Sequence, residues 1–134
     1  MATSEHFSAD ELSCSHCGRG ADIVSARLLE LVEQLRSNCG GYPLQCNCAY
    51  RCPEHNAEVG GVPNSQHVLG TAMDIQCPSQ LTIGQFKWYC EQLPFDGIGY
   101  YPWTDENGGG FIHVDVRKGG ISDSTNRAYW EWDD

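Results

Sequence analysis

Apolar residues recur every three or four positions between residues 23 and 35, a spacing that places them on one side of an α-helix. They are Ile23, Val24, Leu28, Leu31, Val32 and Leu35. Asp22 precedes this pattern as a candidate N-cap, and Gly40-Gly41 follow it as a stop. We therefore predict an amphipathic helix of about 15 residues in this part of the chain.

A second apolar stripe predicts a shorter helix within residues 82–93, where Ile83, Phe86, Cys90 and Leu93 share one side. Other segments alternate between apolar and polar residues or are rich in β-branched and aromatic ones, as is typical of strands. We expect strands within residues 42–50, 72–75, 97–101, 111–117 and 129–132. Residues 105–110 are rich in Gly and Asn, which predicts a hairpin turn.

The order of these elements predicts an α+β fold, with helices packed on a small antiparallel sheet. A chain of 134 residues is long enough for one hydrophobic core but not for two. We expect a single domain over residues 1–134, in which residues 1–20 form a cysteine-containing segment and residues 21–134 form the core. We also expect a monomer.

The chain is acidic, with 18 Asp and Glu against 8 Lys and Arg and a formal charge of −10. This balance argues against a nucleic-acid partner, since phosphate backbones are bound by clustered cations. No apolar run approaches the roughly 20 residues that span a bilayer, so we expect no membrane span. The polar stretch Met1 to Leu12 does not resemble a standard signal peptide.

Two histidines and one aspartate are the strongest candidates for chemistry. Asp74 and His113 each interrupt an apolar strand, where a buried charge needs a counter-charge or a metal. His67 lies seven residues before Asp74, and two imidazoles with one carboxylate suit a zinc ion that keeps one open position. Asp115 should share a strand face with His113, either as its hydrogen-bond partner or as a proton acceptor.

Eight cysteines are many for a chain of this length. Cys14-x-x-Cys17 has the spacing of metal ligands, and Cys46 and Cys48, or Cys52, are candidates to complete a second, structural zinc site. Disulfides joining the same segments are about equally plausible. The redox state of the cysteines stays open, and a cysteine-rich zinc-ribbon protein is a minor alternative for the whole chain.

Several motifs together resemble the zinc D-Ala-D-Ala carboxypeptidases of bacteria and phages, whose fold is related to the hedgehog signalling domain. The resemblance runs from Phe7 to Arg117. It rests on the segment Tyr50 to Asn56, on Val59-Gly60-Gly61, on Asn64-Ser65-Gln66-His67 with Gly70, Ala72 and Asp74, on Gly97 to Tyr101, and on His113-Val114-Asp115. It implies hydrolysis of a peptide bond in peptidoglycan stem peptides or cross-links, by carboxypeptidase or endopeptidase cleavage.

The resemblance also implies roles for individual residues. His67, Asp74 and His113 would hold the catalytic zinc, and Arg51 would bind the terminal carboxylate of the substrate or the developing oxyanion. The chemistry of arginine supports this role for Arg51, because a planar guanidinium can form two parallel hydrogen bonds to one carboxylate. Further substrate contacts are expected from Ser65 and from an aromatic cleft wall, with Tyr100, Tyr101 and Trp103 as its candidates.

The chain departs from the family pattern just before His113. Some relatives carry an acid or a second histidine there, whereas this chain has Gly110 and Phe111, which cannot move protons. Asp115 is then the first candidate for the general base, followed by Glu106 and His55. The alternative is a hedgehog-like binding module that keeps the zinc without turnover. An enzyme would act on the cell wall after export or after release by lysis.

Overall fold

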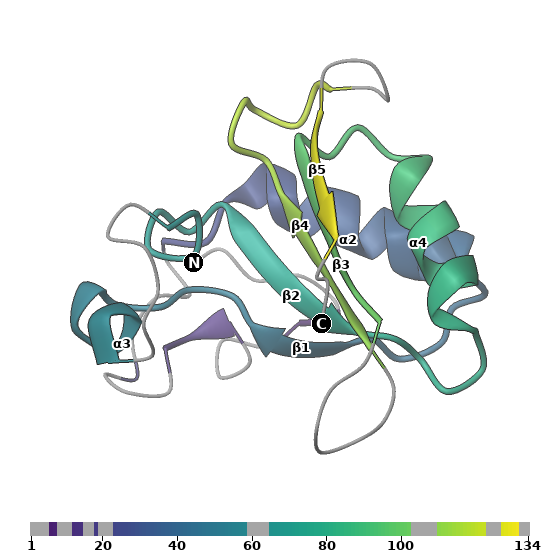
Figure 1. Ribbon diagram of the computed structural model, residues 1–134, viewed down its shortest axis with the longest axis horizontal. Helices are drawn as coiled ribbons and strands as arrows, with labels where there is room; N and C mark the ends of the chain where they lie inside the picture. Colours follow the sequence, from purple (N-terminus) through teal and green to yellow (C-terminus); the bar gives the residue numbers. More distant parts are fainter. Residues whose placement is uncertain are drawn as a thin grey trace.

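The strands of a computed structural model form one sheet in the order β1-β2-β4-β3-β5 (Figure 1). The structure describes residues 6–7, 12–14, 18, 23–58, 65–102, 110–122 and 127–131. Its elements are α2 (Ala26–Asn38), β1 (Gln45–Cys48), α3 (Pro53–Glu58), β2 (Ala72–Gln76), α4 (Ile83–Glu91), β3 (Gly97–Tyr101), β4 (Phe111–Asp115) and β5 (Ala128–Glu131).

The predicted α+β class is confirmed, with one difference in strand direction. Strands β1, β2, β4 and β3 pair antiparallel with their neighbours, whereas β5 joins the free edge of β3 in parallel. The sheet is therefore mixed rather than purely antiparallel. Several strands are also shorter than expected, since the strand predicted within residues 42–50 covers only Gln45–Cys48 and β4 ends at Asp115.

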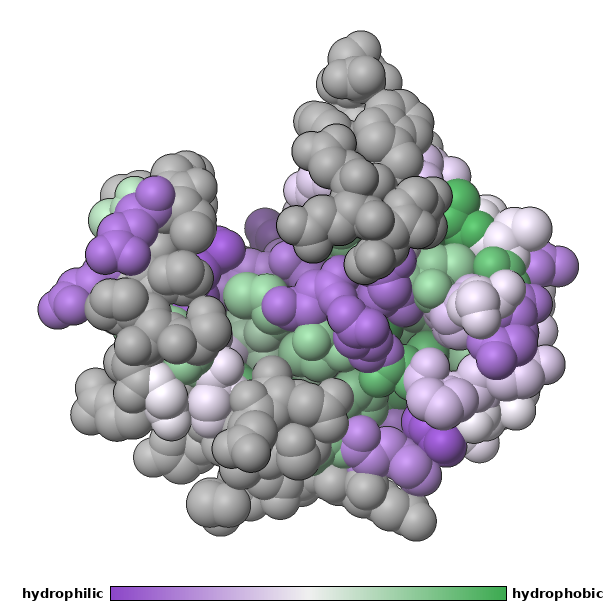
Figure 2. Space-filling view, turned by 90° about the horizontal axis from the view of Figure 1, so that it is seen from below, coloured by the Kyte–Doolittle hydropathy of each residue, from purple (hydrophilic) through white to green (hydrophobic). Residues whose placement is uncertain are grey.

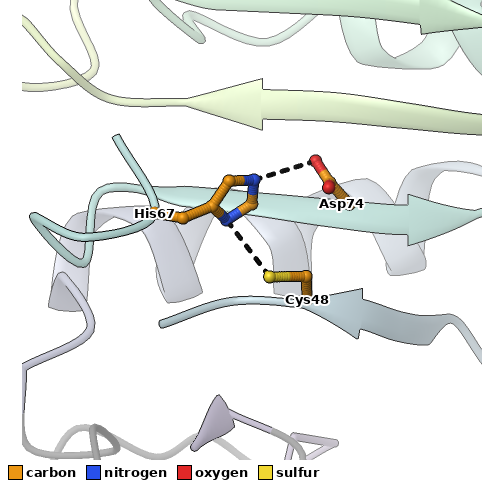
Figure 3. A group of neighbouring side chains, drawn as sticks. All are labelled: Cys48, His67 and Asp74. Carbon is orange, nitrogen blue, oxygen red and sulfur yellow. Dashed lines mark hydrogen bonds and ion pairs between the residues drawn. The ribbon is translucent and has the colours of Figure 1, made fainter. Parts of the chain in front are cut away.

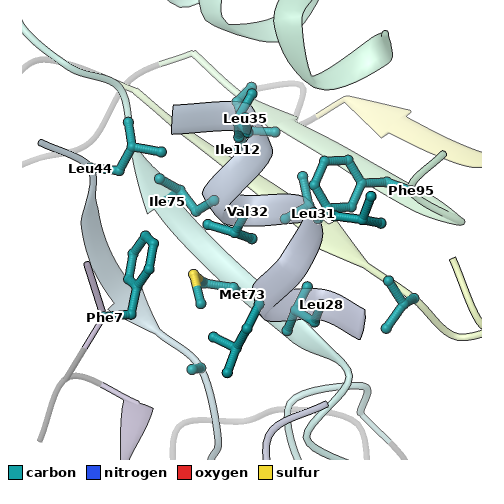
Figure 4. Close-up of a cluster of buried hydrophobic side chains, with 14 of the residues drawn as sticks. Phe7, Leu28, Leu31, Val32, Leu35, Leu44, Met73, Ile75, Phe95 and Ile112 are labelled. Carbon is teal, nitrogen blue, oxygen red and sulfur yellow. The ribbon is translucent and has the colours of Figure 1, made fainter. Parts of the chain in front are cut away.

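The hydrophobic core lies between one face of the sheet and helix α2 (Figure 4). Because side chains alternate along a strand, the apolar residues of β2, β3 and β4 fall on that face and the polar ones on the other. The core residues from the central strands are Met73, Ile75, Ile98, Ile112 and Val114, and those from α2 include Leu28, Leu31, Val32 and Leu35. All nine are fully buried, or nearly so.

Helix α2 begins later than the sequence pattern indicated. Its N-cap is Ser25, whose side-chain oxygen accepts a hydrogen bond from the Leu28 amide, so the assignment of Asp22 as the cap was wrong. Ile23 and Val24 belong to the turn before the helix. In α4, Thr82 and Gln85 exchange hydrogen bonds as a complete capping box, which fixes where that helix starts.

Gly70 is required where the chain turns from His67 into β2. Its φ is +75°, in the left-handed region, and a Cβ there would lie 2.4 Å from the Ile23 carbonyl oxygen. The amide of Ser25 donates to the Gly70 carbonyl oxygen at 2.8 Å, which joins this turn to the start of α2. The glycine therefore serves close packing against residue 23.

The surface seen from below mixes hydrophilic and apolar side chains (Figure 2). The exposed large apolar residues of the described chain lie on different elements and are Ile23, Leu69, Trp88, Ile121 and Tyr129. Among the described helices, none is long and apolar enough to cross a bilayer.

Candidate metal site

One row of cross-strand partners carries the site on the face of the sheet opposite the core. The register pairs Cys48 with Asp74, Asp74 with His113, and His113 with Gly99. Gly99 in turn pairs with Trp130 of β5, so the row crosses all five strands in the order of the sheet. An irregularity between Cys46 and Cys48 in β1 sets the register that places Cys48 in this row.

His67 comes from the turn before β2 and is nearly buried, with 4% of its surface exposed. Its Nδ1–H donates to the Ala49 carbonyl oxygen at 2.8 Å. That hydrogen bond selects the tautomer and leaves Nε2 facing Oδ1 of Asp74 at 3.2 Å. A ligand histidine is usually held in this way, by a backbone carbonyl on the nitrogen that does not bind the metal.

His113 is held in the complementary orientation. Its Nε2 lies 3.0 Å from Oδ2 of Asp115, and its Nδ1 lies 3.0 Å from Oδ1 of Asp74. With Nε2–H donating to Asp115, Nδ1 is the nitrogen that faces Asp74, and it becomes available to a metal once it loses its proton. The two imidazole rings meet edge to face with centroids 5.2 Å apart, so one nitrogen from each converges on the same carboxylate oxygen.

The charges of the metal-free site reinforce each other. Burial lowers the pKa of His67, but the hydrogen bonds that the ring makes, first of all the one that it donates to Asp74, outweigh burial and raise the pKa to about 10. The pKa of His113 is also raised, since its bonds to Asp115 and Asp74 outweigh burial. Burial raises the pKa of Asp74, but the two histidines reverse this and lower it. Binding of a metal must therefore displace protons from the imidazoles.

The donor set fits Zn²⁺. Two imidazole nitrogens and one carboxylate oxygen are the three-ligand set of many catalytic zinc sites. Each histidine has a partner on its other nitrogen, Ala49 for His67 and Asp115 for His113, which holds the rings in position for a metal.

These donors open into a cavity of about 640 Å³. Arg51 lies on its wall, where its Nε donates to the Asn56 side-chain oxygen at 3.0 Å and its Nη2 to the Ser65 hydroxyl at 3.4 Å. The Ser65 hydroxyl also accepts from the His67 amide at 3.3 Å, so it links the arginine to the ligand turn. The lining residues are Arg51, Ser65, Gln66, His67, Asp74, Tyr101, Phe111, His113, Arg117 and Trp130.

The family assignment agrees with this geometry. Residues 5–115 match the family described as Peptidase M15. The chain belongs to the Peptidase M15 family. No curated protein matches the chain.

Membership confirms the resemblance to the zinc D-Ala-D-Ala carboxypeptidases that the sequence motifs indicated. Peptidases of this family are zinc-dependent, which supports a metallopeptidase with a peptide substrate. The scissile bond and the individual roles of the site residues of this M15 peptidase remain predictions.

The structure places Asp115 behind the site rather than on the cavity wall. Its side chain is fully buried and bonds His113 through Oδ2 and Arg117 through both oxygens. Burial raises the pKa of Asp115, but its bonds from His113 and Arg117 lower it to about 2. An efficient proton acceptor has a pKa near the working pH. Of the two roles expected for Asp115, this geometry favours holding His113.

Cys48 is a contact of the site that sequence reasoning assigned elsewhere. Its Sγ lies 3.6 Å from Nδ1 of His67, on the opposite side of the ring from Asp74 (Figure 3). Ligand atoms of Cys48, His67 and Asp74 all lie within 4.8 Å of one another, so they form a rival metal triad. We favour the set containing His113, because Cys48 lies against the nitrogen that Ala49 already occupies.

The second zinc site predicted from the cysteines is not shown. Cys17 lies outside the described residues, and the thiol of Cys48 contacts His67. Glu106 and Trp103 also lie outside the described residues, as does the side chain of His55.

The aromatic wall of the cavity contains Tyr101 rather than Tyr100. Tyr100 pairs with Ile112 on the core side of the sheet, where Lys87 of α4 lies over its ring. Tyr101 lines the cavity and stacks on Phe111 at 4.5 Å between ring centroids. The alternation along β3 selects which tyrosine of this segment reaches the cavity.

Arg117 and Trp130 also line the cavity and were missed from sequence. Arg117 follows Asp115 by two residues, so strand alternation was a signal that could have placed it beside His113 and Asp115. No comparable signal existed for Trp130, because its position depends on the parallel pairing of β5 with β3. Gly99 makes room for the Trp130 ring, since a Cβ at residue 99 would lie 2.5 Å from the indole Nε1.

Proposed function

We propose that this M15 peptidase hydrolyses a peptide bond in the stem peptides or cross-links of peptidoglycan. Zn²⁺ would be held by His67, Asp74 and His113. The supporting observation is the convergence of His67 Nε2 and His113 Nδ1 on Asp74 Oδ1, in a cavity that also contains Arg51. A zinc ion held there supplies Lewis-acid chemistry for attack on an amide near neutral pH.

Arg51 would bind an anionic group of the substrate. Its guanidinium is oriented by Asn56 and Ser65, and a fork of this kind forms paired hydrogen bonds to a carboxylate. Ser65 then acts mainly through Arg51 and the His67 turn. In this assignment the carboxylate of a terminal residue would lie at Arg51 while the scissile carbonyl lies at the metal ligands.

Asp115 would position His113 in this reaction. A carboxylate on the outer nitrogen of a ligand histidine fixes the ring and makes it a better donor. Proton transfer would then fall to another group, for which Glu106 and His55 were the further candidates.

A second candidate function is a zinc-containing binding module without turnover. One observation favours it: among the described residues that line the cavity, Asp74 is the sole carboxylate, and it belongs to the proposed ligand set. A binder would keep the zinc and Arg51 and would hold a peptide without cleaving it.

Mass analysis of peptidoglycan digests separates the two functions. Purified peptidoglycan is incubated with the zinc-loaded protein, with the same protein after chelation, and with His67→Ala. We expect released D-Ala or newly freed cross-link amines in the first sample only. Zinc bound tightly without any new product would instead support the binding module. The product masses also identify the cleaved bond and so distinguish carboxypeptidase from endopeptidase action.

A further inference from the structure

We infer that Arg117 is a second carboxylate-binding residue, and that the substrate carries a free carboxylate on each side of the scissile bond. This inference rests on the proposed peptidase function and specifies the substrate of the same site.

The two arginines of the cavity lie at opposite ends of a chain of contacts. Arg51 adjoins His67, since its amide donates to the His67 carbonyl oxygen at 3.2 Å. His67 contacts Asp74, and Asp74 contacts His113. His113 contacts Asp115, and Asp115 accepts hydrogen bonds from Arg117. Across the sheet, Arg51 follows β1 and the Arg117 guanidinium lies over Trp130 of β5, so the candidate ligands on β2 and β4 come between them in the order of the strands.

The guanidinium of Arg117 is held rigidly while part of it stays available. Its Nε donates to Oδ1 of Asp115 at 2.9 Å and its Nη2 to Oδ2 at 2.6 Å. The guanidinium carbon lies 5.5 Å from the centroid of the Trp130 ring. A guanidinium has five N–H donors, so this arrangement leaves Nη1 without a partner among the described residues. The side chain is 32% exposed and lines the cavity.

Such an arrangement favours binding of an anion over a purely structural ion pair. A rigid guanidinium loses little conformational entropy when it binds a carboxylate, because its fork is already oriented. Asp115 is fully buried behind it, so the side of the guanidinium away from Asp115 is the one available to a ligand. Tyr101 and Phe111 form a rigid aromatic pair on the same wall.

The charges around the cavity also match a substrate with two carboxylates. When a metal binds, the two imidazoles become neutral, and the charges of Arg51 and Arg117 are then balanced by those of Asp74 and Asp115. A divalent zinc ion then leaves the site with two positive charges, in a chain whose formal charge is −10. A doubly anionic peptide neutralises this excess, and the acidic surface elsewhere disfavours binding outside the cavity.

Three synthetic peptides test the inference. They are N-acetyl-L-Ala-γ-D-Glu-L-Lys-D-Ala-D-Ala with both carboxylates free, the same peptide with a C-terminal amide, and the same peptide with the D-Glu carboxylate as an amide. Each is titrated calorimetrically into the metal-free wild type, Arg117→Gln, Arg51→Gln and Arg36→Gln. Arg36 lies in the last turn of α2, outside the cavity, and serves as the matched control.

We expect each amidation to weaken binding to the wild type by about tenfold, the scale of one charge-assisted hydrogen-bonded pair. Arg117→Gln should weaken binding of the diacid by a similar factor and should leave exactly one monoamide unaffected. Arg51→Gln should leave the other monoamide unaffected, and Arg36→Gln should change none. Arg117→Lys keeps the positive charge but lacks the guanidinium fork. Its affinity for the diacid peptide should lie between those of the wild type and Arg117→Gln.

The inference is overturned if Arg117→Gln weakens all three peptides by the same factor or changes none of them. Equal weakening would mean that Arg117 acts only by holding Asp115. The thermal midpoint and zinc content of each variant are measured alongside, and Arg117→Lys provides the test if Arg117→Gln does not fold. Hydrolysis of the same peptides by the zinc-loaded protein is scored separately. Selective binding without cleavage would contradict the proposed function and leave the carboxylate pairing intact.

Discussion

At the scale of single residues, His113 contacts two carboxylates with different tasks. Nδ1 faces Asp74 on the metal side and Nε2 faces Asp115 on the buried side. His67 follows the same rule with a backbone carbonyl as its buried partner. The orientation of both rings is therefore set by groups that a metal need not touch.

Replacing His113 and Cys48 in turn decides between the two possible metal triads. We expect His113→Ala to lose most of its zinc, because it removes one of three converging donors. Cys48→Ser should retain about one zinc per chain, since Sγ lies at the nitrogen of His67 that faces away from Asp74. Metal analysis after dialysis against a weak chelator measures both. If Cys48→Ser loses as much zinc as His113→Ala does, the Cys48 thiol is identified as a ligand and the prediction is wrong.

Asp115→Asn tests whether this carboxylate positions His113. The substitution preserves the shape of the side chain but removes the charge that bonds both His113 and Arg117. We expect zinc affinity to fall by about 10- to 100-fold, the usual effect of losing such a partner. Competition with a chromophoric chelator gives the affinity. Glu30→Gln, an exposed carboxylate on α2, is the control.

The opposite result for Asp115→Asn would also be informative. Unchanged zinc affinity together with lost hydrolysis would assign Asp115 to proton transfer rather than to positioning.

At the scale of elements, the start of β3 depends on two neighbouring residues, a glycine that leaves room for a buried carboxylate and an aspartate that is itself buried. Gly97 pairs with Asp115, and a Cβ there would lie 2.2 Å from the Asp115 carboxylate, so glycine is needed for the buried acid. Asp96, directly before it, is a fully buried carboxylate that binds the loop after β4. It accepts from the amides of Lys118, Gly120 and Ile121 and from the Ser122 hydroxyl.

Asp96→Asn should destabilise the fold by about 2–4 kcal/mol at pH 7, because the amide group turns a donor toward other donors in a buried site. Burial raises the pKa of Asp96, but these hydrogen bonds lower it below its ordinary value of 3.8. A lowered pKa means stability that is present above pH 3.8 and lost as the pH falls through the folded value. The difference between wild type and variant should therefore shrink in acid.

Denaturant unfolding of the metal-free protein at pH 7 and near pH 3 measures this difference. Ser122→Ala, which removes one of the four donors, should cost about 1 kcal/mol and serves as the graded control. A cost of Asp96→Asn that does not change with pH would contradict the assigned role of the carboxylate.

At the scale of the whole molecule, the site brings two adjacent central strands and the turn before β2 together around one ion. Its donors come from the turn before β2, from β2 and from β4, all of which share the core beneath. Zinc should therefore stabilise the entire fold. At a free concentration of about 100 times Kd the gain is roughly 2.7 kcal/mol, and a chelator should reverse it.

The gain from zinc should decrease as the pH falls from 8 to 5. In the metal-free protein the pKa of His67 is raised to about 10, so its own contribution to stability is complete below its ordinary value of 6.5 and is lost as the pH rises through 10. Zinc must displace that proton, so the affinity of the site for zinc decreases as the pH falls. Thermal midpoints with and without zinc across this range test it, and a constant increment would contradict it.

The sequence by itself determined the parts that depend on local patterns. The spacing of apolar residues identified α2 and α4, because a buried stripe on a helix has a period that few other structures share. Strand alternation placed His113 and Asp115 on one face. The motif from Ser65 to Asp74 indicated the family, which the match over residues 5–115 confirms.

Only the tertiary structure decided the features that depend on register. A shift of one residue exchanges the two faces of a strand, so Tyr101 rather than Tyr100 at the cavity could not be read from the segment alone. The row from Cys48 to Trp130 requires strand pairings between distant parts of the chain. The burial of Asp115 behind Arg117 likewise follows from packing, because the groups that surround a carboxylate are brought together only by the tertiary fold.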